Sequence, residues 1–500
     1  MNVTGVGLSA AMSIRTVLEM RRQLDDLQRQ LGTGKKSVDY AGLGLDRGLT
    51  IGLRAQLSAF AGYQQTIAQV GVRLDLMQTA LDQFGTVTTS AKNAVLQSRF
   101  ALNGGTTTQA QADTRTLLDQ AVALLNTAAD NRYLFAGRNV DRPPVESVER
   151  ILNGDGARAG FAQVTAERRL ADLGANGLGR LVVGAPSATA VSLTEDAVSP
   201  FGFKLAGVQS QLTGATVSGP AGTPAALTID LGATNPNDGD TVRFSFTLPD
   251  GTSRELVLTA TNSPTPAPGQ FAIGATSDVT AANLGVALTQ ALGTLAATEL
   301  VAASAVAAGN DFFDTDAANP PRRVAGPPFD SATALVAGTA ADTVFWYVGD
   351  DGTDDPRGTA VARADQSLSV SYGVRASERA LRRTVQSLAV FSVATFSAGD
   401  PNAETRYAAL QQRVGAALVG PANEQKISDI QGELAGAQVA LNAAKDRHRQ
   451  TASALEGLLQ GVEGVSTEEV AAKILALQTS LQGTLQTTAM LLRTNLLEYL

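Results

Sequence analysis

Apolar residues recur at steps of three and four along one long stretch of the chain, from Leu53 to Leu102. A mean spacing of 3.5 residues keeps such side chains on one slowly drifting stripe of a helix, which is the pattern of a coiled-coil interface. A single helix over this stretch would be roughly 75 Å long at a rise of 1.5 Å per residue. The alternative is two ordinary helices broken near Gly85. The stripe consists of Leu53, Leu57, Phe60, Ile67, Val70, Leu74, Met77, Leu81, Phe84, Ala91 and Val95.

The same spacing predicts further helices near both ends of the sequence. A shorter helix precedes the long stretch, and its stripe is Val17, Met20, Leu24, Leu27 and Leu31. Another is predicted from Thr108 to Asn131, and the pattern returns after Ala403. Ser466 followed by Glu469 fits a capping box that starts the last helix. Because each helix has an apolar stripe with no other obvious partner, we expect the terminal regions to pack in one bundle.

Between residues 138 and 402 the helical period is lost, and Gly, Pro, Thr, Ala and Asp dominate. Val242 to Leu248 and Leu256 to Leu258 flank a Pro-Asp-Gly turn, which predicts a β-hairpin. Strands are also predicted at 227–231, 342–348 and 367–372, and helices at 280–303 and 377–395. The expected fold class is therefore α+β multidomain, with long coiled-coil helices from both chain ends around a β-rich insertion. The expected domains are 1–137, 138–402 and 403–500.

Composition excludes several classes of function. The chain has no cysteine and a single histidine, so thiolate metal sites, disulfides and most histidine-based zinc or triad chemistry are excluded. Its net charge is −8 and Lys and Arg form no long cluster, so a nucleic-acid partner is not expected. No run of eighteen apolar residues and no conventional secretory signal are present, so membrane insertion is not expected.

Three features of the sequence could carry chemistry. His448 lies on an apolar stripe, so a histidine at a helix interface is expected rather than a catalytic one. The acidic run from Gly349 to Asp355 could supply oxygen ligands to a cation, but it lacks EF-hand spacing and an acidic surface turn is favoured. The adjacent Trp346 and Tyr347 give slight support to a glycan-binding module. No enzyme motif is present, so we predict no catalytic residue, no metal site and no cofactor.

Several short motifs carry a family resemblance. The segment Leu31-Gly32-Thr33-Gly34-Lys35-Lys36 resembles one that follows the first helix of the flagellin superfamily of bacterial axial proteins. The segment Arg132-Tyr133-Leu134-Phe135-Ala136-Gly137, followed by Asp141 and by Pro143-Pro144, is similar to a motif of the hook-filament junction (hook-associated) proteins. The final Leu496-Leu497-Glu498-Tyr499-Leu500 resembles the ending of the same proteins. The residues after Lys36 and the start of the sequence depart from the family pattern.

The resemblance implies a structural subunit of the bacterial flagellum that is exported by the type III route with a chaperone and assembles outside the cell for motility. Its partners would be identical subunits, hook-associated proteins and flagellin. A filament-forming flagellin is the alternative, because the central insertion is large for a junction protein. A cytoplasmic coiled-coil scaffold and a displayed glycan-binding or enzymatic module are further alternatives.

Assembly is expected to depend on one set of apolar residues from both terminal regions. These residues lie on the stripes of the first, long and last helices, where each stripe can be covered by a neighbouring helix. The expected assembly residues are Leu24, Leu27, Leu31, Leu74, Met77 and Leu81, with Leu477, Leu481, Leu492 and Leu496 opposite them.

Overall fold

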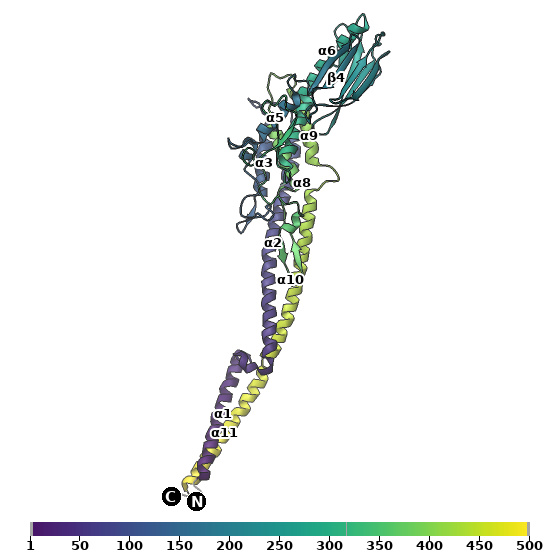
Figure 1. Ribbon diagram of the computed structural model, residues 1–500. Helices are drawn as coiled ribbons and strands as arrows, with labels where there is room; N and C mark the ends of the chain where they lie inside the picture. Colours follow the sequence, from purple (N-terminus) through teal and green to yellow (C-terminus); the bar gives the residue numbers. More distant parts are fainter. Residues whose placement is uncertain (1–3, 317, 498–500) are drawn as a thin grey trace. The chain divides into compact units, whose positions relative to one another are not determined.

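The computed structural model describes residues 4–316 and 318–497, and the side chains of residues 11–316 and 318–490. It is a mixed α and β fold with many helices and several small sheets (Figure 1). The chain divides into two compact units. The first contains the chain up to Gly71, Ala362–Val370 and the chain from Gln438, and the second contains Val72–Val361 and Ser371–Ala437. This division passes through two long helices, whereas the boundaries at 137 and 402 stay predictions.

The first unit is mainly helical. Helix α1 (Thr4–Thr33) packs against α11 (Thr467–Leu497), and the two run side by side in Figure 1. Between α1 and the next helix lies a short 3-10 segment, η1 (Tyr40–Asp46). Parts of α2 (Arg47–Leu96) and α10 (Ile427–Glu463) complete the unit, together with the hairpin of β13 (Val361–Arg363) and β14 (Ser369–Ser371).

Helix α2 confirms that the long apolar stretch forms one helix. It continues through Gly85 without a break, which rules out the alternative of two helices, but it ends at Leu96 rather than at Leu102. Beyond it the chain forms a turn in which Leu102 bridges to Thr108. In the second unit its stripe is nearly free of solvent contact, and the buried members are Leu74, Met77, Leu81, Phe84, Ala91 and Val95.

Helix α3 (Gln109–Leu125) begins with a capping box, in which the Thr108 hydroxyl accepts from Gln111 N and the Gln111 side chain accepts from Thr108 N. The prediction that this helix reaches Asn131 is wrong, because it ends at Leu125. The chain then turns back between β1 (Ala128–Ala129) and β2 (Arg132–Tyr133). Asp130 and Asn131 form that turn with φ of 51° and 59°, values that these two residue types tolerate better than most.

The remaining helices of the second unit surround α3 and the sheets. Helix α3 packs against α8 (Arg379–Val393), which confirms the helix predicted at 377–395. Helix α8 in turn packs against α9 (Ala403–Val419), which begins where the helical pattern resumes. The others are α4 (Val148–Asn153) and α5 (Phe161–Leu173).

Two four-stranded sheets gather beside α6 (Figure 1). One has the order β3-β4-β7-β6 and the other β10-β9-β8-β5. The predicted hairpin is confirmed as β8 (Thr241–Thr247) and β9 (Ser253–Thr261), and the strand predicted at 227–231 as β7 (Ala226–Asp230). The other strands are β3 (Leu181–Ser187), β4 (Ala190–Glu195), β5 (Lys204–Ser210), β6 (Thr216–Ala221) and β10 (Gln270–Ala272).

A long apolar helical run forms the core of these sheets. It consists of α6 (Ser277–Leu295), a π-turn η2 (Ala296–Leu300) and α7 (Val301–Phe313), so the helix predicted at 280–303 extends further. Among the described residues, only this run is long and apolar enough to cross a membrane by length and composition, and 56% of its most apolar window is buried. We interpret it as a core helix, because Leu284, Leu288 and Leu292 are fully buried with Phe244, Phe246 and Phe271.

The strand predicted at 342–348 is wrong. That segment forms only isolated β-bridges, Thr343 with Ala159 and Tyr347 with Val145. The residues it pairs with lie in loops, so no continuous ladder forms. The prediction at 367–372 is confirmed only as the three residues of β14. Short elements fill the rest of this region: β11 (Arg322–Val324), β12 (Leu335–Ala337) and the 3-10 turn η3 (Pro356–Thr359).

Candidate functional site

The pair of α1 and α11 leaves its apolar stripes only half covered. The helices are antiparallel, because Lys35 bridges to Gly464 at one end while the Thr484 hydroxyl lies 4.0 Å from Met20 Sδ further along. Two helices can cover only one side of each stripe, so apolar side chains remain exposed on the pair. Leu31, on the stripe of α1, is 40% exposed, and other apolar residues of the pair, Leu18, Leu475 and Leu485, are 52%, 65% and 43% exposed.

The structure separates the expected assembly residues into two groups. Leu24, Leu27, Leu477 and Leu481 are half-buried on α1 and α11, and Leu31 is 40% exposed beside them. Leu74, Met77 and Leu81 are fully buried in the second unit by other residues of the same chain. The side chains of Leu492 and Leu496 lie outside the described residues. The structure therefore brings the first group together on one helix pair and places the second group in a closed core.

The Gly34–Lys35 motif joins α1 to α11 at one end of this helix pair. Gly34 has a φ of 68°, which glycine adopts without strain, and its carbonyl accepts from Val465 N. Lys36 N donates to Glu463 O, so the loop after α1 pairs with the loop between α10 and α11. Half of the predicted capping box is present, since Ser466 Oγ accepts from Glu469 N, whereas the Glu469 carboxylate accepts from Lys473 Nζ. These contacts hold the end of α1 next to the start of α11.

An ion pair stabilises the same loop. The Glu463 carboxylate accepts from Arg54 Nε at 2.9 Å and from a terminal nitrogen of Arg54 at 2.7 Å. These hydrogen bonds lower the pKa of Glu463 and raise that of Arg54. Because the pKa of Glu463 is lower in the folded state than in the unfolded state, the unfolded chain binds the proton first as the pH falls. The stabilisation is therefore present at neutral pH and is lost as the pH falls through the folded-state pKa of Glu463.

We expect a Glu463→Gln variant to melt about 1–3 °C below the wild type at neutral pH, since solvent screens a pair whose arginine is 43% exposed. This difference in Tm should disappear when the pH is lowered below the pKa of Glu463. Circular dichroism melts of both proteins at several pH values measure it. A difference in Tm that is the same in acid and at neutral pH would contradict the assignment.

The second family motif forms part of the core of the second unit. Phe135, Ala136 and Gly137 are buried, whereas Tyr133 and Leu134 are half-buried. Gly137 has a φ of 62°, and a Cβ there would lie 2.6 Å from Asp350 Cβ, so only glycine fits. The motif is held by backbone bonds, from Gly137 N to Val374 O and from Ala376 N to Phe135 O. Pro143 is exposed and Pro144 is buried, whereas Tyr499 and Leu500 lie outside the described residues.

The acidic turn is mostly exposed, as predicted, since Asp351, Asp354 and Asp355 are exposed, but Asp350 within it is held in an ion pair. Asp350 is nearly buried and accepts from Arg375, whose terminal nitrogen lies 2.9 Å from Asp350 Oδ2. Burial alone would raise the pKa of Asp350, but the hydrogen bonds from Arg375 and Gly352 hold it below its ordinary value. Arg138 contacts Asp350 and Asp354 as well. Arg375 and Arg138 occupy the carboxylates of Asp350 and Asp354, and no group of three metal-ligating side chains is found among the described residues.

Trp346 and Tyr347 are packed inside the second unit. Trp346 is fully buried and donates from Nε1 to Phe313 O at 2.9 Å, and Tyr347 is 7% exposed. Stacking on a sugar requires an exposed aromatic face. Neither ring offers one, so these two residues give no support to a glycan-binding module.

His448 lies in the first unit between two aromatic rings, with ring centroids 5.1 Å from Phe60 and 5.6 Å from Tyr63. It is 2% exposed, and its Nε2 lies 3.4 Å from Asp365 Oδ2 in the β13–β14 hairpin. This contact joins the hairpin to α10. The packing is that of a structural histidine at a helix interface.

Comparisons with known proteins add no family assignment. No protein-family model matches the chain, and no curated protein matches it significantly.

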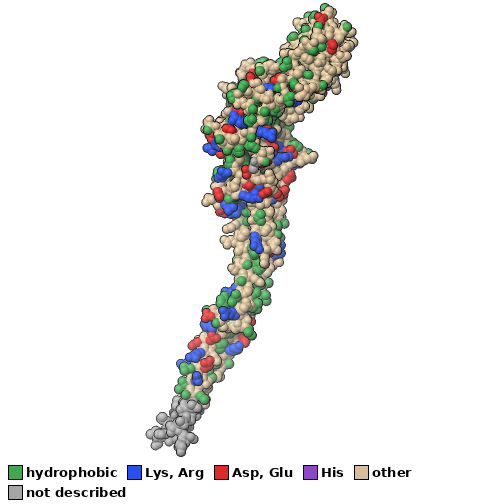
Figure 2. All heavy atoms as spheres, viewed as in Figure 1, with side chains coloured by type: hydrophobic (Ala, Val, Ile, Leu, Met, Phe, Trp, Pro, Cys, Tyr) green, Lys and Arg blue, Asp and Glu red, His purple; other side chains and the backbone are tan. Residues whose placement is uncertain are grey.

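On the face shown in Figure 2, Lys and Arg side chains are interspersed with Asp and Glu rather than gathered by sign. Reasoning from the sequence missed the loop pairing at Gly34 and the partners of the acidic turn. The glycine motif and the arginines at positions 138 and 375 were visible in the sequence. The sequence did not show which residues they contact.

Proposed function

We propose that this chain is a structural subunit of the bacterial flagellum, of the flagellin family, and that it acts at the junction between hook and filament. The observation that carries the proposal is the pairing of the first and last helices with their apolar stripes half covered. In this proposal α1 and α11 complete a coiled-coil bundle by packing against neighbouring subunits. The motifs around Gly34 and Phe135 support the family, and the motif followed by Pro143-Pro144 favours the junction.

The physical chemistry of the chain supports assembly after export. A chain without cysteine can be unfolded for passage without breaking disulfides. Once outside, an uncovered apolar stripe gains a core by packing against another copy. Contacts between unlike surfaces of identical subunits build open helical arrays when the rotation between neighbours does not close into a ring. Self-assembly and contacts with the other axial proteins would both use the α1–α11 pair.

Immunogold electron microscopy of intact cells, beside a deletion strain, tests the proposal. We expect label confined to the base of the filament, and filaments shed into the medium by the deletion strain. Label along the whole filament, with no filament in the deletion strain, would assign the chain as filament flagellin instead. Protein found only in the cytosol and never in sheared appendages would reject a flagellar role.

A further inference from the structure

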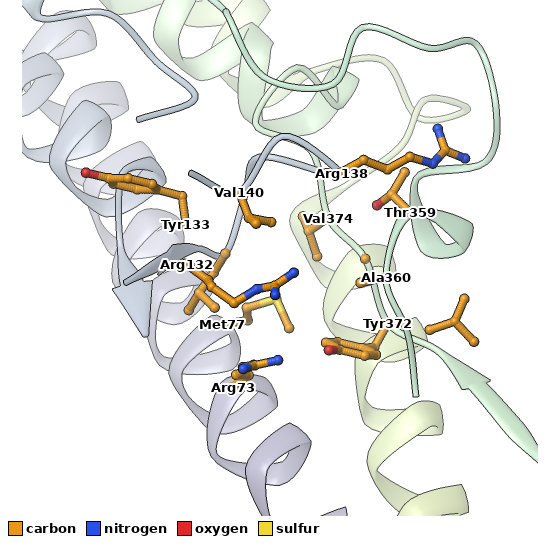
Figure 3. Close-up of a pocket in the computed structure, with 14 residues that line it drawn as sticks. Arg73, Met77, Arg132, Tyr133, Arg138, Val140, Thr359, Ala360, Tyr372 and Val374 are labelled. Carbon is orange, nitrogen blue, oxygen red and sulfur yellow. The ribbon is translucent and has the colours of Figure 1, made fainter. Parts of the chain in front are cut away.

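A cavity of about 400 Å³ lies in the second unit, between α2, the segment after β2 and the residues around Tyr372 (Figure 3). Figure 3 shows Arg73 of α2 and Arg132 of β2 pointing into the same space, with Tyr372 on the opposite wall and its hydroxyl facing inward. Val140 and Val361 supply accessible apolar lining, whereas Met77 and Val374 lie fully buried behind the wall. Three different parts of the chain therefore present hydrogen-bond donors to one space.

The cavity has positive charge without a matching carboxylate. Arg73, Arg132 and Arg138 line it, and none of its lining residues is Asp or Glu. The guanidinium of Arg138 is already engaged, since it lies 3.3 Å from Asp350 and 2.6 Å from Asp354. Arg73 and Arg132 are the two cations that remain for the cavity.

These two arginines lack adequate partners. The ion pair of Arg73 is a contact of 3.9 Å with Asp130, whose side chain is 77% exposed, and solvent screens such a pair. Arg73 Nε is buried and has no hydrogen-bond partner. Arg132 is exposed, and it has no ion-pair partner within 4 Å in the part of the chain that the structure describes. A buried donor without an acceptor is unfavourable, and so are two like charges that share one space.

We propose that this cavity is a binding site for a carboxylate. A guanidinium matches the two oxygens of a carboxylate with parallel hydrogen bonds, and here two guanidinium groups and a phenol hydroxyl surround one space. The apolar lining of Val140 and Val361, which keep accessible surface, suits the carbon chain that carries the carboxylate, which a bare inorganic anion lacks. The carboxylate belongs either to a free organic acid or to an acidic side chain of a second copy, and the chain has 47 such residues. The inference stands apart from the flagellar proposal.

Calorimetric titration of succinate into the full-length protein tests the site, with Arg132→Gln and Arg73→Gln as the site variants. Arg142→Gln is the matched control, because Arg142 is exposed like Arg132 but does not line the cavity. We expect saturable binding to the wild type and to R142Q, and binding at least tenfold weaker to R132Q and R73Q. Succinamide, the uncharged analogue, should not bind. The emission of buried Trp346 checks that each variant is folded.

Sedimentation velocity distinguishes the two sources of the carboxylate. If a second copy supplies it, R132Q and excess succinate should each weaken self-association, while R142Q should associate like the wild type. If R132Q loses succinate binding but associates normally, the ligand is a free organic acid. The proposal is overturned if the wild type shows no saturable binding and R132Q associates unchanged, or if R142Q loses as much binding as R132Q.

Discussion

Replacing Leu481 with aspartate is expected to abolish incorporation of the subunit into the flagellum and with it motility. Leu481 is half-buried on the α1–α11 pair, and in the proposed assembly a neighbouring subunit covers it. Burying a carboxylate without a partner costs several kcal/mol, and each step of about 1.4 kcal/mol lowers an association constant tenfold. Swimming assays and the amount of subunit in sheared appendages measure the effect.

The matched control is Gln482→Asp, which places the same charge one residue away on an exposed position of α11. We expect this variant to assemble and swim like the wild type. Secretion into the medium should persist for L481D, which separates failed assembly from failed export. Wild-type motility of L481D would reject the α1–α11 pair as an assembly surface.

Replacing Arg375 with alanine is expected to destabilise the second unit by about 3 kcal/mol, the lower part of the range for breaking a buried ion pair. The substitution leaves Asp350, whose side chain is 10% exposed, without its main partner. Arg138 compensates only in part, since it lies 3.3 Å away and is 48% exposed. Urea unfolding followed by the emission of Trp346, the only tryptophan, reports on this unit alone.

The matched control is Arg379→Ala, an arginine nearby in sequence whose side chain is 57% exposed and 3.6 Å from Glu424. We expect a loss of less than about 1 kcal/mol there, as is usual for a surface pair. Equal losses of unfolding free energy in R375A and R379A would show that the Arg375–Asp350 pair stabilises the unit no more than a surface pair does. A loss near zero in R375A would indicate that water replaces the arginine.

Features that depend on a short stretch of sequence could be predicted. The continuous helix through Gly85 follows from a three-four spacing of apolar residues that runs from Leu53 to Val95 and is interrupted only at Gln64 and Thr88. The β8–β9 hairpin follows from alternation on both sides of a Pro-Asp-Gly turn, and the start of α11 follows from the Ser466 cap. The prediction of α3 failed at its end, because Asp130 and Asn131 favour a turn that the helical period does not register.

The site could be predicted only in part. The motifs identified Gly34 and Gly137 as special, but not that Gly34 pairs with Val465 or that Gly137 lies against Asp350. The predicted assembly residues lie on apolar stripes that have the same spacing on every helix. Burial then distinguished Leu481, which is half-exposed on a helix pair, from Leu81, which is fully buried.

The sequence by itself determined where most helices and the main hairpin lie, because periodicity and turn chemistry act between residues close in the chain. Only the tertiary structure decided that α1 packs against α11, that Arg375 meets Asp350, and that Arg73 and Arg132 line one cavity. Those contacts join residues far apart in the chain. An apolar stripe or a charge shows that a partner is needed without showing which residue provides it.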